Sequence, residues 1–148
     1  MPTHSDKRVM PYTAEQMYDL VADVGRYPEF LPWNSAARVR SVDEQPDGTK
    51  VMKADLVISF RVFRERFGSH VVLDHDNMRI DTEYLDGPFK YMKSYWQFRD
   101  LDAGCEVEFF VDFEFRNAML RNLIGVVFNQ AMQRIVKAFE DRARELYG

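Results

Sequence analysis

The sequence predicts an α+β fold in which strands and helices occupy separate stretches of the chain. Apolar residues recur at helical spacing only near the two ends, whereas residues 34–115 largely alternate between apolar and polar. The turn-forming sequences QPDG, DHDN, LDGP and LDAG interrupt that middle stretch. Short loops favour antiparallel neighbours, so we expect a strand, a short helix, about six further strands and a long C-terminal helix.

The N-terminal part predicts one strand and one short helix. Residues 3–10 alternate weakly, which is compatible with a first strand. Residues 13–16, TAEQ, match a capping box, so a helix should begin at Ala14 and Gly25 is its natural end. Residues 27–33, YPEFLPW, then combine two prolines with large apolar side chains, which suits neither a good helix nor a good strand.

The central strands are predicted from their alternation. One face of residues 50–60 carries Met52, Ala54, Leu56, Ile58 and Phe60, and one face of residues 105–115 carries Cys105, Val107, Phe109, Val111, Phe113 and Phe115. Further strands are expected near residues 62–73, 78–85 and 89–99. The last of these has Met92, Trp96 and Phe98 on one face and Phe89, Tyr91 and Tyr95 on the other. Its aromatic side chains exceed the needs of one core face, so some should cover a ligand or a partner surface.

Helical spacing returns from Asn117, a good N-cap, to Tyr147. The apolar stripe comprises Leu120, Leu123, Ile124, Val127, Phe128, Ala131, Ile135, Phe139, Ala143 and Leu146. At about 1.5 Å per residue this helix is roughly 45 Å long, enough to lie diagonally across a sheet. Gly125 costs about 1 kcal/mol relative to alanine, which indicates either a close backbone approach or deliberate room.

Length and composition favour a single domain covering residues 1–148. The net charge of −4 makes DNA an unexpected partner. The single cysteine cannot form an intramolecular disulfide, and the N-terminus lacks the apolar region of a secretory signal. We therefore expect a cytoplasmic protein. Because no apolar run approaches the roughly 20 residues of a membrane span, any contact with the inner membrane should be peripheral.

The chemistry of an enzyme is not evident. The chain has no HExxH, CxxC, Gly-rich phosphate loop or GxSxG, and no histidine pairs by pattern with Cys105. We expect no catalytic residue, no metal and no covalent cofactor. Glu65 shares the strand parity of Phe67 and Val71, which leaves two interpretations: a polar anchor inside an apolar pocket, or a side chain returned to water by a bulge near Gly68.

Three stretches in order, DVGRYPEFLPW, DGPFKYMKSYWQF and FNQAMQRIVKAFEDRARELYG, resemble the coenzyme-Q-binding START-domain family. That family lies within the wider polyketide cyclase/START superfamily and includes proteins named ribosome association toxin RatA. The resemblance extends from about Arg8 to Gly148. It implies a helix-grip fold, in which an antiparallel sheet of about seven strands wraps around the long C-terminal helix and encloses an apolar cavity.

The resemblance further implies non-enzymatic binding of ubiquinone or a similar polyisoprenoid lipid, as a carrier or chaperone that supports respiratory electron transfer. By strand and helix parity, the expected cavity wall comprises Leu56, Ile58, Phe60, Phe67, Trp96, Phe109, Phe113, Ile124 and Phe128. In a helix grip, Tyr27, Phe30, Leu31 and Trp33 would form the mouth of the cavity or a plug that seals the core.

Two alternatives stay open. A RatA-like role would bind the large ribosomal subunit and inhibit subunit association. The basic surface for it would comprise Arg64, Arg66, Lys90, Lys93, Arg116 and Arg121. A cyclase or aromatase would instead need polar groups that line the pocket, for which Glu65 is the one candidate.

Overall fold

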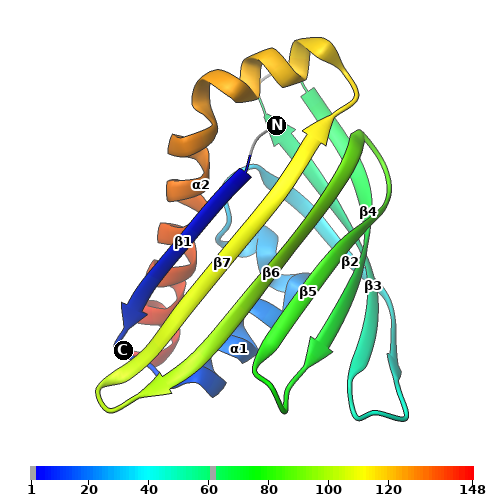
Figure 1. Cartoon of the computed structure of the whole chain (residues 1–148). Coiled ribbons are helices and arrows are strands. Elements are labelled where there is room, and N and C mark those ends of the chain that lie inside the picture. Colours follow the sequence, from blue (N-terminus) through cyan, green and yellow to red (C-terminus); the bar gives the residue numbers. More distant parts are fainter. Residues whose placement is uncertain (1–2, 61–62) are drawn as a thin grey trace.

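The structure is a computed structural model that describes residues 3–60 and 63–148, with the side chains of Phe60, Phe63 and Val127 left out. Seven strands form one sheet: β1 (Thr3–Met10), β2 (Asn34–Glu44), β3 (Lys50–Phe60), β4 (Phe63–Asp74), β5 (Arg79–Asp86), β6 (Phe89–Leu101) and β7 (Gly104–Phe115). The helices are α1 (Ala14–Ala22), the 3₁₀ helix η1 (Val24–Glu29) and α2 (Ala118–Tyr147). Figure 1 shows these elements in sequence colours.

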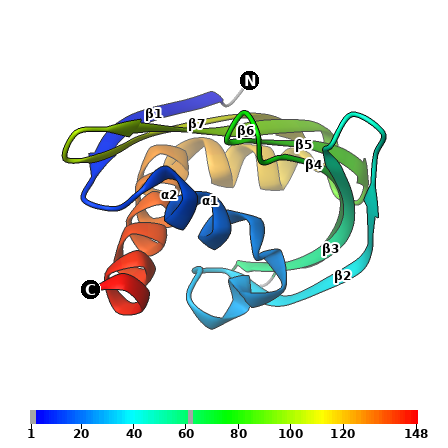
Figure 2. The same ribbon diagram turned by 90° about the horizontal axis from the view of Figure 1, so that it is seen from below.

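All strand pairs are antiparallel, and the strand order is β1-β7-β6-β5-β4-β3-β2. Neighbours in sequence are thus neighbours in the sheet, except that β1 pairs with β7. The sheet curves strongly, and α1, η1 and α2 all lie on its concave side (Figure 2). This arrangement is the helix-grip fold, so the predicted fold class is confirmed.

The capping box at the start of α1 is confirmed. The backbone N–H of Gln16 donates to the Thr13 hydroxyl, and the backbone N–H of Thr13 donates to the Gln16 side chain, each at 3.0 Å. The predicted end is wrong, because α1 stops at Ala22 and the chain continues as η1 from Val24. The YPEFLPW segment is therefore helical in its first three residues. A short 3₁₀ helix accommodates Pro28, whose fixed φ is close to helical values.

The predicted faces of β3 and β7 are confirmed: Met52, Ala54, Cys105 and Val107 are all at most 3% exposed. Phe89 is different. Its predicted outer position is wrong, because its side chain is only 5% exposed in the core. The β6–β7 register shifts between Phe89 and Tyr91. Such a bulge adds one residue to a strand and moves the preceding side chain to the other face of the sheet.

The start of α2 is also as predicted, because the Asn117 side chain accepts hydrogen bonds from the backbone N–H groups of Met119 and Leu120. The first turns of α2 cross the end of the sheet, and the rest of the helix turns down along it (Figure 1). A Cβ atom on Gly125 would meet nothing within 4 Å, so of the two predicted reasons for this glycine the close backbone approach is wrong and open space around it is what the structure has.

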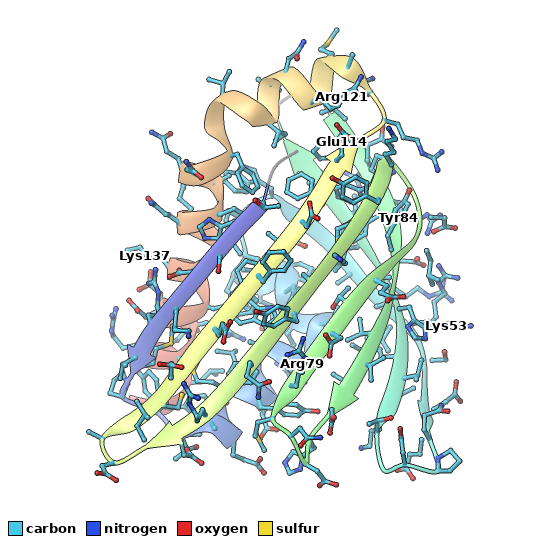
Figure 3. The ribbon with its side chains drawn as sticks, viewed as in Figure 1. Lys53, Arg79, Tyr84, Glu114, Arg121 and Lys137 are labelled. Carbon is cyan, nitrogen blue, oxygen red and sulfur yellow. The ribbon has the colours of Figure 1, made fainter. Side chains whose placement is uncertain are left out.

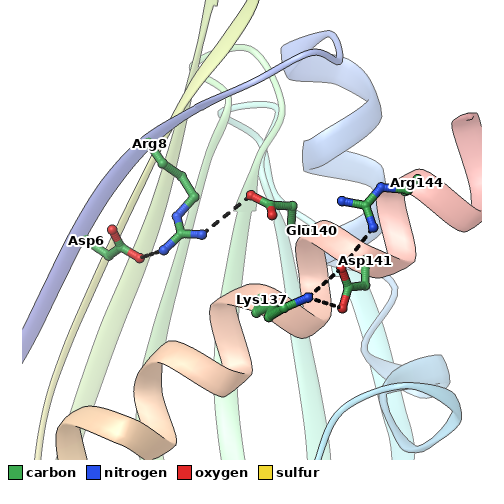
Figure 4. Close-up of polar contacts among 6 residues, drawn as sticks. All are labelled: Asp6, Arg8, Lys137, Glu140, Asp141 and Arg144. Carbon is green, nitrogen blue, oxygen red and sulfur yellow. Dashed lines mark hydrogen bonds and ion pairs between the residues drawn. The ribbon is translucent and has the colours of Figure 1, made fainter.

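Ion pairs surround the C-terminal half of α2. Arg8 of β1 binds Glu140 at 3.4 Å, which joins the edge strand to the helix. Asp141 binds Lys137 at 2.9 Å and Arg144 at 3.2 Å along the helix surface (Figure 4). Beneath them Phe139 and Ala143 of the predicted stripe are buried, whereas Leu146 near the end is 49% exposed.

Candidate functional site

A cavity of about 250 Å³ lies between the concave face of the sheet and the helices. Strands β3 to β7 form its floor, α2 covers it, and α1, η1 and residues 31–34 complete the wall. None of its described lining side chains carries a charge. Charged groups such as Lys53, Arg79 and Lys137 lie on the outside of the molecule instead (Figure 3).

The wall of the cavity is strongly aromatic. The Trp96 ring lies 4.4 Å from that of Phe109 and 5.0 Å from that of Phe139, which joins β6, β7 and α2. Phe89 of β6 packs edge-on against Phe67 of β4 at 5.2 Å. Such ring pairs hold one another in place, so the wall keeps its shape without an occupant.

Most of the residues predicted for the wall and mouth line this cavity. They are Tyr27, Leu31, Trp33, Leu56, Ile58, Phe67, Trp96, Phe109, Phe113 and Ile124. Strand parity was a sufficient guide for Leu56, Ile58, Phe67, Phe109 and Phe113, because the registers of β3, β4 and β7 keep it unbroken between these residues.

Two predicted residues lie elsewhere. Phe30 packs outside the cavity, with its ring 5.3 Å from that of Phe139 and the Arg142 guanidinium 5.2 Å from its centre. Phe128 is buried between the sheet and α2, with its ring 5.3 Å from that of Phe113 and 6.2 Å from that of His4. The side chain of Phe60 lies outside the described part of the chain.

Glu65 does not line the cavity. It lies opposite Ile58 in the register of β3 and β4, which is the parity expected from the sequence, yet its side chain is exposed. Glu65 is the third residue of β4, in the hairpin with β3, where the carboxylate reaches water. The register does shift near Gly68, but in the pairing of β4 with β5. The polar anchor is thus not in the cavity.

Several residues outside the predicted wall also line the cavity, among them Phe89, Thr82 and Ser94. Phe89 was predicted on the outer face, because the sequence does not reveal the bulge in β6 that turns its side chain inward. Thr82 and Ser94 share strand parity with Ile80 and Trp96, so the signal for their placement was present in the sequence. The predicted wall comprised only apolar and aromatic side chains, so these two hydroxyls were not part of it.

The segment between η1 and β2 contributes both to the cavity and to the packing around it. The Tyr27 hydroxyl donates to the Val21 carbonyl of α1, and burial raises the pKa of this hydroxyl. Trp33 lines the cavity with a φ of 64°, and the Arg134 guanidinium lies 5.3 Å from its ring. The aromatic side chains on this segment are therefore fixed by contacts with α1 and α2.

No Asp, Glu, His, Lys, Arg or Cys side chain lines the described wall. Cys105 is fully buried in the core, and burial, helped by nearby Asp100, raises the pKa of its thiol to about 11. A thiol with this pKa stays protonated at neutral pH. Among the described residues, no cluster of His, Cys, Asp and Glu side chains could hold a metal ion.

The family model for polyketide cyclase / dehydrase and lipid transport matches residues 10–140. The chain belongs to this family. Curated relatives of this family member include the ribosome association toxin RatA of Rickettsia prowazekii, 37% identical over 142 residues that cover 94% of each chain. The mitochondrial coenzyme Q-binding protein COQ10 homolog B of Xenopus laevis is 32% identical over 151 residues, which cover 98% of this chain and 59% of that one.

Solved structures with the same fold superpose on the chain. An 18 kDa protein from Caulobacter crescentus superposes with a TM-score of 0.82 and 32% identity, covering 100% of this chain and 99% of that one. The Zhui aromatase/cyclase from Streptomyces sp. R1128 superposes with a TM-score of 0.77 at 18% identity, over 97% and 93% of the two chains, and shows the fold alone. Among the helices of residues 3–60 and 63–148, none combines the length and hydropathy that a membrane span requires.

Proposed function

We propose that the chain binds a hydrophobic small molecule of the polyisoprenoid quinone class, such as ubiquinone, and serves as its carrier or chaperone in respiratory electron transfer. The observation that carries this proposal is the apolar cavity of about 250 Å³. That volume exceeds the roughly 150 Å³ of a cavity that holds benzene and approaches the ~300 Å³ of small ligand pockets. A ring and the first part of an isoprenoid tail fit such a space.

Burial of apolar surface supplies the affinity in this proposal. At about 25 cal/mol per Å², covering roughly 100 Å² of a ligand contributes about 2.5 kcal/mol before any polar contact forms. The rings of Trp96, Phe109 and Phe139 pack against one another, so little side-chain entropy is lost when a ligand binds. This order of the wall increases the affinity further.

The choice of a quinone among hydrophobic ligands is supported by the name of the Xenopus laevis relative, a coenzyme Q-binding protein. Binding without turnover is supported by the absence of Asp, Glu, His, Lys, Arg and Cys from the described lining. The relatives named RatA and COQ10 likewise do not carry enzyme names, although the fold is shared with an aromatase/cyclase.

A carrier of this kind has to exchange its ligand with a membrane. The first half of α2 exposes two apolar side chains, Met119 at 66% and Val126 at 85%, and includes Ile124 of the cavity wall. Arg116 lies just before this half of the helix, and Arg121 lies on it, 3.9 Å from Glu114. We assign peripheral contact with the inner membrane to this surface, since exposed apolar residues beside cations suit an anionic bilayer.

Filling the cavity tests the proposal. Ala131 of α2 lines the cavity and is 7% exposed. Ala131→Phe should weaken binding of ubiquinone with a two-isoprene tail at least tenfold, measured by calorimetric titration, because the new ring occupies the ligand volume. Gln130→Phe places the same ring on the exposed side of the helix and should change the affinity less than about twofold. Equal affinity of Ala131→Phe and wild type would contradict binding in this cavity.

A second candidate function is association with the large ribosomal subunit, supported by the relatives named ribosome association toxin RatA. The basic side chains available for it are partly engaged. Lys90 and Arg121 each lie 3.9 Å from Glu114, and Figure 3 shows Arg121 beside Glu114 at the end of β7. Arg66 binds Asp55 and Asp86. This pairing reduces the positive charge that is free to contact phosphate.

Co-sedimentation with purified large subunits tests this second function. Association through phosphate contacts should weaken steeply as the salt concentration rises, because bound counterions are released. Ala131→Phe serves as the control that separates the two functions, since it fills the cavity and leaves the surface charges unchanged. Absence of co-sedimentation at low salt would contradict the ribosomal role.

A further inference from the structure

A row of four side chains crosses the cavity floor from β4 to β7. In the strand registers Val71 lies opposite Thr82, Thr82 opposite Ser94, and Ser94 opposite Val111. All four line the cavity. The middle of the row is therefore polar and both ends are apolar, although valine has nearly the shape of threonine and would pack equally well there.

The two hydroxyls of this row have no partner within residues 3–60 and 63–148. Nearby Ser69 provides the contrast, because its hydroxyl donates to the Ala54 carbonyl at 3.1 Å and its side chain is 2% exposed. Neither Thr82 nor Ser94 forms a comparable hydrogen bond in the described structure. Both side chains are half-buried, so an occupant that excludes water from the cavity leaves these hydroxyls unpaired unless it brings a polar group of its own.

Their spacing suits one shared acceptor. Residues directly opposite each other in an antiparallel pair have Cβ atoms about 4.5–5.5 Å apart. Each hydroxyl can donate one hydrogen bond, and a carbonyl oxygen can accept two. An ionised head group does not suit the site, since no cation lines the described wall and a buried charge would lose its hydration without compensation.

We infer that Thr82 and Ser94 form a polar subsite that recognises the carbonyl oxygen of a neutral ring, and this inference rests on the proposed function. The ring sits at the middle of the sheet floor, and the apolar remainder of the ligand contacts the aromatic wall. The subsite selects quinones over isoprenoid hydrocarbons, which lack an acceptor, and over fatty-acid anions, which carry a charge.

Displacement of the neutral dye Nile red from the full-length protein measures this selectivity. The probes are ubiquinone with a two-isoprene tail, the hydrocarbon farnesene and oleate. Wild type should prefer the quinone to oleate. The double variant T82V/S94A should bind the quinone about tenfold more weakly and farnesene within about twofold of wild type.

Two controls separate a polar subsite from a change of shape. Thr82→Ser keeps the hydroxyl and should keep the preference for the quinone. Val111→Ala removes apolar surface beside Ser94 and should weaken quinone and farnesene alike. Thermal unfolding identifies any variant that does not fold, and the single variant Ser94→Ala then replaces the double one.

The outcomes distinguish the two proposals. Equal effects of T82V/S94A on quinone and farnesene would overturn the subsite while leaving the apolar cavity as a binding site. Displacement by oleate as strong as by the quinone would also overturn it. If no probe displaces the dye from wild type, the proposed function fails, and the subsite fails with it.

Discussion

Asp55 joins three strands on the outer face of the sheet. Its carboxylate accepts hydrogen bonds from Arg40 of β2 at 2.8 and 2.6 Å and from Arg66 of β4 at 2.7 Å. The hydrogen bonds from Arg40 and the charges of both arginines hold the pKa of Asp55 below its ordinary value, against the opposing effect of partial burial. This network stabilises the strongly curved part of the sheet, where β2 and β3 form one side of the molecule (Figure 2).

A pH-dependent stability follows for Asp55. Because its folded-state pKa is lowered, its contribution is fully present above the unfolded pKa of about 3.9 and is lost as the pH falls through the folded value. Asp55→Asn should therefore be less stable than wild type near neutral pH, and the difference should vanish in acid. Urea unfolding at a series of pH values measures this.

The matched control is Asp102→Asn, in the turn between β6 and β7, where the described structure gives the carboxylate no ion pair. Its free energy of unfolding near neutral pH should differ little from that of wild type. If both variants show the same pH profile, the network does not stabilise the fold in this way.

At the same scale, the sequence predicts residues well where strand parity is unbroken. Leu56, Phe67 and Phe109 line the cavity as expected. Phe89 could not be placed, because the bulge beside it has no reliable sequence signal. Glu65 has the expected parity, but parity alone does not tell how far the cavity extends along a hairpin.

At the scale of elements, two glycines with opposite surroundings test the packing. Gly104 at the start of β7 has a φ of 145°, and a Cβ atom there would lie 2.1 Å from the Met10 carbonyl oxygen. Gly125 of α2 has open space around it. The first glycine is thus required for β1 to approach the β6–β7 turn, and the second is not required by any contact.

Alanine at these two positions should have opposite effects. Gly104→Ala should lower the free energy of unfolding by roughly 2–4 kcal/mol, through backbone strain and the clash with Met10. Gly125→Ala should raise it by about 0.5–1 kcal/mol, since alanine is the better helix former. Urea denaturation measures both, and a Gly104→Ala protein as stable as wild type would contradict the described turn.

Element starts were more predictable than element ends. Thr13 and Asn117 are the N-cap residues of α1 and α2, and their side chains accept hydrogen bonds from backbone N–H groups of the first turn. Because N-caps favour a few residue types, these helix starts can be predicted from the sequence. The end of α1 at Ala22 depends instead on where η1 can begin to pack, and that is a tertiary contact. The sequence was thus sufficient to predict which helices and strands exist and in what order, but not where some of them end, such as α1 at Ala22.

At the scale of the whole molecule, separate stretches of period two and period 3.6 were sufficient to predict the order of strands and helices, whereas the sheet that wraps around the long helix was implied by the family resemblance. The cavity follows from the same arrangement, because the sheet curves strongly (Figure 2) and the helices on its concave side leave a space of about 250 Å³. Its volume could not be predicted, since it depends on how side chains from six strands, two α-helices and η1 pack together.

The central claim is that this space carries a quinone-class ligand, and co-purification tests it most directly. The protein would be produced in a quinone-producing bacterium, purified without detergent, extracted with organic solvent and examined for stoichiometric lipid by mass spectrometry, with Ala131→Phe prepared in parallel. The account predicts a bound polyisoprenoid quinone in wild type and its loss in Ala131→Phe. A wild-type protein that is empty and also fails to take up added quinone would contradict it.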